Sequence, residues 1–170
     1  MSAFINNANF FDAQHHALGL VVSDGMAYGQ AYQGIGGMLQ VQNGGVRVRS
    51  TILQAMQRAS RSGDERRKPS MLVTNGQASF ANPQNDRISR RMVAGQDAQG
   101  RIVLIATTSV VGMKLVDLSS YLASTDLQLV NAVNFDGGGS TMLALDVPGQ
   151  PPYHILSLDP VPTVLAVYAR

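Results

Sequence analysis

A run of three glycines between two apolar segments constrains this chain more than any other feature. Residues 134–142 read Asn-Phe-Asp-Gly-Gly-Gly-Ser-Thr-Met, and apolar strands are predicted on either side, over residues 127–133 and 142–145. Glycine loses more backbone freedom on folding than any other residue, so three in a row are costly to order. The run is either a tight connection between strands or a loop whose backbone closely approaches a ligand. We favour the second interpretation, because functional residues concentrate on loops held by rigid strands.

The side chains beside the glycines are suited to a chemical site. Asp136 ends the first strand, and Ser140 and Thr141 supply hydroxyl groups after the glycines. Without Cβ atoms in the way, successive glycine N–H groups can converge on an anion. Asn134 lies two positions before Asp136, so on a strand both side chains face the same way. The predicted ligand-binding residues are Asn134, Gly137, Gly138, Gly139, Ser140 and Thr141.

Composition and charge narrow the classes of function. The 170 residues are 45% hydrophobic and 14% charged, as in one packed globular domain. The net charge is only +2, which gives no reason to expect a nucleic acid partner, and no apolar run approaches the roughly 20 residues of a membrane span. The chain has no cysteine, which excludes thiol nucleophiles, disulfides and thiolate metal sites. The P-loop pattern G-x-x-x-x-G-K-[ST] and the nucleophile elbow G-x-S-x-G are both absent.

Turn residues and apolar periodicity predict the fold class. Hairpin turns are predicted where residues that tolerate positive φ separate two apolar runs, at Asp24-Gly25, Asn43-Gly44 and Asn75-Gly76. A further turn over residues 97–100 precedes an apolar strand over residues 102–106. Apolar residues at helical spacing predict helices over residues 51–61 and 115–123. We expect an α+β fold, with a mixed, mainly antiparallel twisted sheet and two or more packed helices in a single domain.

The glycine segment also resembles a known family signature. Residues 132–142 resemble the pattern A-x-N-L-D-G-G-G-S-S/T-T/S-M of the phosphodiester glycosidase family, with Phe135 in place of the usual leucine. Four other segments resemble family motifs in the same order along the chain, over residues 7–12, 18–25, 89–95 and 161–168. The resemblance implies that residues 1–170 form a phosphodiester glycosidase-like domain, lacking some N-terminal strands of the family. It also implies export to the periplasm or the extracellular space, although no signal peptide opens this sequence.

The resemblance implies a hydrolase that cleaves a sugar-1-phosphodiester and releases sugar and a phosphomonoester. Its implied catalytic residues are Asp136, Arg91 and Asn7. Asp136 would serve as acid, base or charge-stabilising group, because a carboxylate near the anomeric carbon stabilises an oxocarbenium-like transition state. Arg91 matches the family arginine, and its planar fork suits phosphate oxygens. Arg90 is expected to point to the opposite face of the strand and to take no part. Asn7 would hydrogen-bond the sugar or the phosphate.

Simpler interpretations stay open at this stage. Asp136 would also suit a plain turn, and Arg91 a solvated strand edge. The alternative function is a non-catalytic module that binds glycan phosphates or exopolysaccharide. The basic segment from Arg58 to Lys68 is either a solvated loop or a means of attracting an anionic substrate. The sequence gives no indication of the oligomeric state.

No cofactor and no metal site are predicted. The histidines His15, His16 and His154 are too few and too dispersed for a zinc site. A divalent cation such as calcium or magnesium, held by Asp136 and backbone oxygens, stays open as an alternative.

Overall fold

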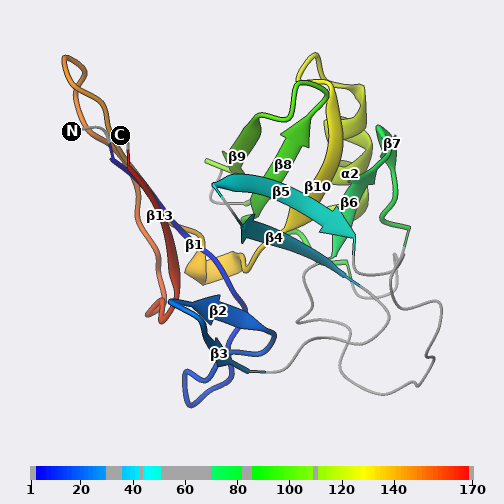
Figure 1. Ribbon diagram of the computed structural model, residues 1–170. Coiled ribbons are helices and arrows are strands. Elements are labelled where there is room, and N and C mark those ends of the chain that lie inside the picture. Colours follow the sequence, from blue (N-terminus) through cyan, green and yellow to red (C-terminus); the bar gives the residue numbers. More distant parts are fainter. Residues whose placement is uncertain are drawn as a thin grey trace.

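The computed structural model describes residues 3–29, 36–42, 44–50, 70–81, 86–108 and 111–168 (Figure 1). Its strands form a five-stranded sheet in the order β7-β6-β10-β8-β9, a four-stranded sheet in the order β12-β11-β1-β13, and two separate hairpins. The five-stranded sheet contains β6 (Met71–Thr74), β7 (Gln77–Ala78), β8 (Met92–Asp97), β9 (Ile102–Ala106) and β10 (Leu129–Asn134). The four-stranded sheet contains β1 (Ala3–Asn7), β11 (Leu143–Asp146), β12 (Tyr153–Ile155) and β13 (Val164–Tyr168).

The remaining elements are two hairpins and two short helical segments. They are β2 (Val21–Ser23) with β3 (Met26–Tyr28), β4 (Gly37–Gln42) with β5 (Gly45–Ser50), the α-helix α2 (Leu115–Ser124), and the 3₁₀ turn η2 (Gly138–Ser140). Figure 1 shows the β4-β5 hairpin and α2 on opposite faces of the five-stranded sheet, with η2 between that sheet and the four-stranded one. None of the helices in the described part of the chain is long and apolar enough to cross a membrane.

The predicted α+β class with mainly antiparallel pairing is confirmed, and two of its details need correction. Every strand pairing among the described residues is antiparallel, so the sheets are not mixed. The connection through α2 joins β9 to β10, which run in the same direction but do not pair, because β8 lies between them and is antiparallel to both. The expected two or more packed helices are also not found, because the described part of the chain contains one α-helix. That helix is the one expected over residues 115–123, whereas the one expected over residues 51–61 lies outside the described residues.

The local turn predictions are confirmed where the structure describes them. Asp24 and Gly25 have φ of 51° and 78°, and Asn75 and Gly76 have φ of 51° and 77°. Consecutive residues with positive φ match the twist of the flanking strands, so a two-residue loop closes each hairpin. At the third predicted turn, Gly44 has a φ of 75°, and Asn43 lies outside the described residues.

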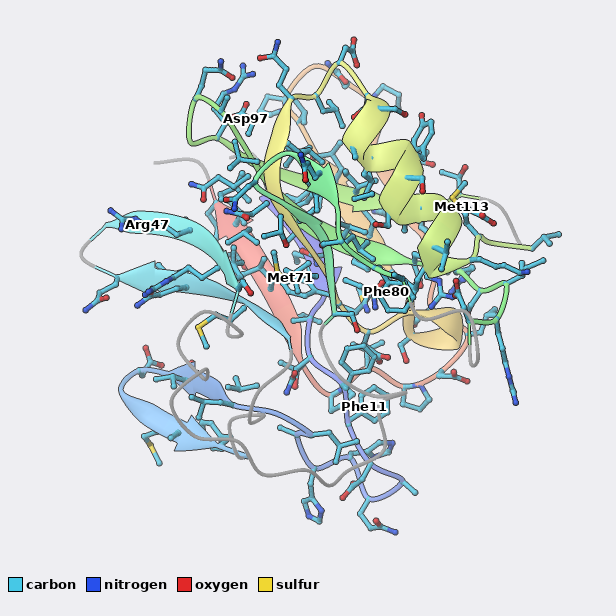
Figure 2. The ribbon with its side chains drawn as sticks, turned by 90° about the vertical axis from the view of Figure 1, so that its right-hand side faces the viewer. Phe11, Arg47, Met71, Phe80, Asp97 and Met113 are labelled. Carbon is cyan, nitrogen blue, oxygen red and sulfur yellow. The ribbon has the colours of Figure 1, made fainter. Side chains whose placement is uncertain are left out.

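Both faces of the five-stranded sheet are covered, so consecutive residues of its central strands are buried on opposite faces. Along β8, Met92 and Ala94 face the core beneath the β4-β5 hairpin and the four-stranded sheet, whereas Val93 faces α2. The first core also contains Met71, which Figure 2 labels, together with Val48, Val133, Phe135 and Leu143. The second core joins Leu118 and Leu122 of α2 to Leu72, Val73, Val93, Leu129 and Ala132. This double burial fixes the position of β10, the strand that leads into the glycines.

Two side chains outside the usual capping positions hold α2. Lys114 at its N-terminus supplies no side-chain cap. Instead the carboxylate of Asp86 accepts the N–H groups of Leu115 and Val116 at 2.7 Å and 2.8 Å. A carboxylate there also interacts favourably with the helix dipole. Within the helix, the fully buried Ser119 connects α2 to the segment around β6 and β7.

Replacement of Ser119 by alanine tests that connection. Its hydroxyl donates to the Leu72 carbonyl at 2.6 Å and accepts the N–H groups of Ser79 and Phe80 at 3.2 Å each. Ser119→Ala should lower the free energy of unfolding by about 1–2 kcal/mol, since the half-buried Phe80 N–H loses its acceptor while the Ser79 N–H still donates to the Leu72 carbonyl at 3.0 Å. Urea denaturation measures this, with Ser120→Ala on the exposed side of the same helix as the control. Equal stability of the two variants would contradict the prediction.

Candidate active site

The glycine run is the crossover between the two sheets. Asp136 follows the end of β10 in the five-stranded sheet, the glycines form η2, and β11 of the four-stranded sheet begins at Leu143. The Asp136 N–H donates to the Ala8 carbonyl at 3.1 Å, so the segment after β1 also contacts the start of this loop. Asp136 is partly buried, and its Oδ1 accepts the N–H of Gly137 at 2.9 Å. The loop therefore presents its carboxylate at a junction where both sheets meet.

Arg90 binds this loop through backbone carbonyls. Its Nε donates to Gly138 O at 3.0 Å, and its Nη2 donates to Gly139 O at 3.1 Å and to Thr141 O at 2.8 Å. Its Nη1 donates to Leu156 O at 3.0 Å, and its own carbonyl accepts the Gly138 N–H at 2.8 Å. The rigid planar fork of a guanidinium allows it to serve several acceptors at once. The expectation that Arg90 takes no part in the site is therefore wrong.

Arg91 lies in a different network. Its Nε donates to Met113 O at 2.9 Å, and its Nη2 contacts Asp86 Oδ1 at 3.4 Å and also donates to Arg87 O. Burial lowers the pKa of Arg91, and the nearby Asp86 carboxylate opposes that shift. Asp86 thus serves both Arg91 and the start of α2. The Nη1 group of Arg91 donates to no atom of the described residues.

Asn7 and Asp136 meet, as the resemblance implies. Asn7 is fully buried at the end of β1, and its Nδ2 donates to the backbone carbonyl of Asp136 at 2.5 Å. Its Oδ1 accepts the N–H of Met142 at 2.9 Å. Both ends of the amide are therefore used to fix the two ends of the glycine loop. Asn7 positions Asp136 through the backbone, and direct contact of Asn7 with a sugar stays a prediction.

Most of the loop N–H groups already have acceptors within the protein. The amides that donate in this way are those of Gly137, Gly138, Ser140, Thr141 and Met142. The Gly139 N–H differs, since it donates to no atom of the described residues. In this conformation the loop therefore offers one amide, and not a converging set, to an anion.

The three glycines are required for three different reasons. A Cβ on Gly137 would lie 2.6 Å from the backbone oxygen of Arg90. Gly138 has a φ of 64°, which side chains other than glycine rarely adopt. A Cβ on Gly139 would lie 1.9 Å from Oδ2 of Asp159. No sequence pattern pointed to Asp159, because it follows the loop by twenty residues and belongs to no chemical motif in the printed sequence.

Three buried polar atoms near the strands of the site have no hydrogen-bond partner in the described part of the chain. They are Asn6 Oδ1, Asn134 Oδ1 and Thr141 Oγ1. Buried polar atoms are normally satisfied by protein, ordered water or a ligand. Asn134 and Thr141 were both predicted to bind ligand, and Ser140 beside them is also buried. Their unused capacity is consistent with that prediction without testing it.

Other predicted features lie apart from the loop or outside the described residues. The basic segment from Arg58 to Lys68 is not among the described residues. His16 contacts Asp12, its Nδ1 lying 3.2 Å from Oδ2, and hydrogen bonds led by the one from the His16 N–H lower the pKa of Asp12. Residues 3–29, 36–42, 44–50, 70–81, 86–108 and 111–168 contain no group of three or more His, Asp or Glu side chains arranged to hold a metal ion.

Comparison with known proteins agrees with the resemblance in the sequence. The sequence model of a family described as phosphodiester glycosidase matches residues 1–168. The comparison with curated proteins gives no match. Among solved structures, the chain is similar to the zebrafish N-acetylglucosamine-1-phosphodiester alpha-N-acetylglucosaminidase catalytic domain auto-inhibited by its pro-peptide, with a TM-score of 0.61 and 22% identity. The match covers 84% of this chain and 53% of the zebrafish chain, so this chain spans about half the length of that domain.

Replacement of Arg90 by lysine tests the organisation of the loop. Lysine keeps the charge, but its three donors share one nitrogen and cannot reach four separated carbonyls. Arg90→Lys should therefore lower the free energy of unfolding by about 2 kcal/mol. Urea denaturation provides the measurement. The control is Arg47→Lys, because Arg47 is exposed on the β4-β5 hairpin (Figure 2). If both variants were as stable as the parent protein, the carbonyl contacts of Arg90 would carry no net stability.

Alanine substitutions along the glycines should separate their roles. Gly137→Ala should be the most destabilising, because the added Cβ meets backbone that cannot rotate away. Gly138→Ala should cost about 1–2 kcal/mol, the strain of a left-handed alanine. Gly139→Ala should cost least, because only the exposed Asp159 side chain must move. Melting temperatures of the three variants give the order, and a Gly139→Ala variant less stable than Gly137→Ala would reverse it.

Proposed function

Because this chain belongs to the phosphodiester glycosidase family, we propose that it hydrolyses a sugar-1-phosphodiester and releases the sugar and a phosphomonoester. The observation that carries the proposal is the family match over residues 1–168, within which Asn7 binds the Asp136 carbonyl and Arg90 binds the carbonyls of the glycines that follow. These contacts fix a carboxylate at the junction of the two sheets. The resemblance implies Asp136 and Asn7 as catalytic residues, and the hydrogen bond between them supports the proposal.

The chemistry requires little from the protein beyond one positioned carboxylate. Water attacks the anomeric carbon, the bond from that carbon to the phosphate oxygen breaks, and Asp136 accepts the proton of the attacking water. The leaving group is a phosphomonoester with a second pKa of about 6, so at neutral pH it leaves without needing a proton donor. A carboxylate beside the anomeric carbon also stabilises the positive charge that develops on the sugar.

The phosphate and the sugar need separate contacts. For the phosphate we assign the Nη1 group of Arg91 and the Gly139 N–H, since neither donates to an atom of the described residues. A Cβ on Gly137 would lie 3.5 Å from Cα of Arg91, so this arginine and the glycine loop are close neighbours. For the sugar we assign Asn134, Ser140 and Thr141. We propose no cofactor for this reaction, and we therefore expect turnover to persist in the presence of a metal chelator. We also propose that the reaction takes place outside the cytoplasm.

A second candidate function is a module that binds glycan phosphates or exopolysaccharide without cleaving them. At 22% identity the likeness to the zebrafish domain shows the fold alone, and that fold is equally compatible with binding without cleavage. Both functions predict binding of a phosphodiester, and only the first predicts turnover. An assay that measures both quantities on the same preparation therefore separates them.

Replacement of Asp136 by asparagine tests the proposed reaction. The change is nearly isosteric, and an amide oxygen still accepts the Gly137 N–H, so the fold should persist. Turnover of a sugar-1-phosphodiester should fall by at least about a hundredfold, the lower range for loss of general acid or base catalysis. Binding of a non-hydrolysable sugar phosphonate, followed by calorimetry, should persist.

The matched control is Asp146→Asn, which removes an exposed carboxylate from the end of β11. Turnover of Asp136→Asn within a few-fold of the parent protein would remove Asp136 from the mechanism. Binding by the parent protein without any turnover would favour the binding module.

A further inference from the structure

The carboxylate of Asp159 lies directly against the middle of the glycine loop. A Cβ on Gly139 would lie 1.9 Å from Oδ2, 2.5 Å from Cγ and 3.0 Å from Oδ1 of Asp159. The Asp159 carboxylate can lie here only because Gly139 has no side chain. The contact brings a negative charge to the one loop amide that donates to no atom of the described residues.

The backbone holds Asp159 at this position. The Gly139 carbonyl accepts the N–H of Leu158 at 2.7 Å and that of Asp159 at 3.3 Å. Arg90 binds the same segment, donating from Nη1 to the Leu156 carbonyl and from Nη2 to the Gly139 carbonyl. One arginine therefore clamps the segment over residues 156–159 onto the glycine loop. The carboxylate is aimed by these contacts and not by a salt bridge of its own.

The charge of Asp159 is not neutralised by its surroundings in the described part of the chain. Its side chain is exposed and forms no ion pair or side-chain hydrogen bond with a described residue. Arg90 binds the segment that contains Asp159, but its guanidinium donates to backbone carbonyl oxygens and not to the Asp159 carboxylate. A phosphate group that approached the Gly139 N–H would therefore meet the negative charge of Asp159.

This arrangement matters because substrate and product differ in charge. A phosphodiester carries one negative charge, whereas a phosphomonoester carries about 1.5 to 2 at pH 7. A carboxylate repels the more highly charged ligand more strongly. We propose that Asp159 determines specificity for the diester, because its carboxylate disfavours the dianionic phosphomonoester at the glycine loop and so promotes release of that product. This inference rests on the proposed function, since it assumes that a phosphate binds at the loop.

The test compares two ligands that differ mainly in charge. Phenyl phosphate and methyl phenyl phosphate differ by one methyl group and by close to one unit of charge at pH 7.5. Calorimetry on the full chain gives the Kd of each ligand, independently of turnover. For Asp159→Asn the preference for the diester over the monoester should fall by about fivefold, the factor for about 1 kcal/mol between unit charges about 4 Å apart in water.

Two further variants sharpen the test. Gly139→Ala keeps the charge but pushes the carboxylate away from the loop, so the preference should fall in the same direction and by less. Asp146→Asn removes the same charge from the end of β11 and should leave the preference unchanged. An effect as large at Asp146 as at Asp159 would overturn the inference, because only the net charge would then matter.

The remaining outcomes distinguish this inference from the function on which it rests. If the parent protein binds both ligands and Asp159→Asn leaves their ratio of Kd values unchanged, the role of Asp159 is overturned while the proposed function stands. If neither ligand binds to the parent protein or to the variant, both ideas are overturned. If the ratio shifts as expected but the parent protein turns over no sugar-1-phosphodiester, Asp159 is a selectivity residue of a binding module.

Discussion

The contact between the Arg90 guanidinium and four backbone carbonyls is the interaction on which the site depends. A carbonyl oxygen has two lone pairs, so those of Gly138 and Gly139 accept the Arg90 guanidinium in addition to backbone N–H groups. Arg90 binds the carbonyls of Gly138, Gly139 and Thr141 and extends to that of Leu156 beyond the next hairpin. Because these carbonyls belong to the crossover between two sheets, one side chain stabilises the loop, its neighbour segment and the relative position of the sheets.

Two adjacent arginines consequently belong to two separate networks. Arg90 is bound to the glycines, and Arg91 is bound to Asp86 and the segment before α2. The division follows from chain direction, because side chains of consecutive residues in an extended segment point opposite ways. The two arginines therefore have separate structural roles, although they look redundant in the sequence. If one of them were replaced, the other could not take over its contacts.

The local parts of this structure could be predicted from the sequence, and the long-range parts could not. The turns at Asp24-Gly25 and Asn75-Gly76 depend on residues that tolerate positive φ, and α2 depends on apolar spacing. A few consecutive residues therefore suffice to predict each of these elements. The choice of Arg91 over Arg90 assumed that both residues lie on a regular strand and that Arg91 faces the site. The structure shows instead that β8 begins only at Met92 and that Ser89 pairs with Met113, a contact that no local pattern reports.

The roles of Asp86 and Asp159 were missed for the same reason. Each acts on a segment at least twenty residues away, and neither belongs to a spacing pattern. The glycine motif predicted close approach of a ligand to the backbone, which stays a prediction, and the groups found close to Gly137 and Gly139 are Arg90 and Asp159. It did not reveal that the approaching groups belong to the protein itself. The family resemblance selected Asn7 and Asp136, and the pairing of β1 with β11 explains why they meet.

The position of β1 between β11 and β13 has a consequence for how the protein is made. The first strand pairs with residues 143–146 on one side and 164–168 on the other, so its partners lie some 140 to 160 positions further along the chain. Pairings between such distant segments are slow to form and require the intervening chain to be present. On a ribosome, Asn7 would emerge long before Asp136 and Met142, the residues it binds. The carboxylate thus reaches its working position only in the finished molecule, and an incomplete nascent chain has no assembled site.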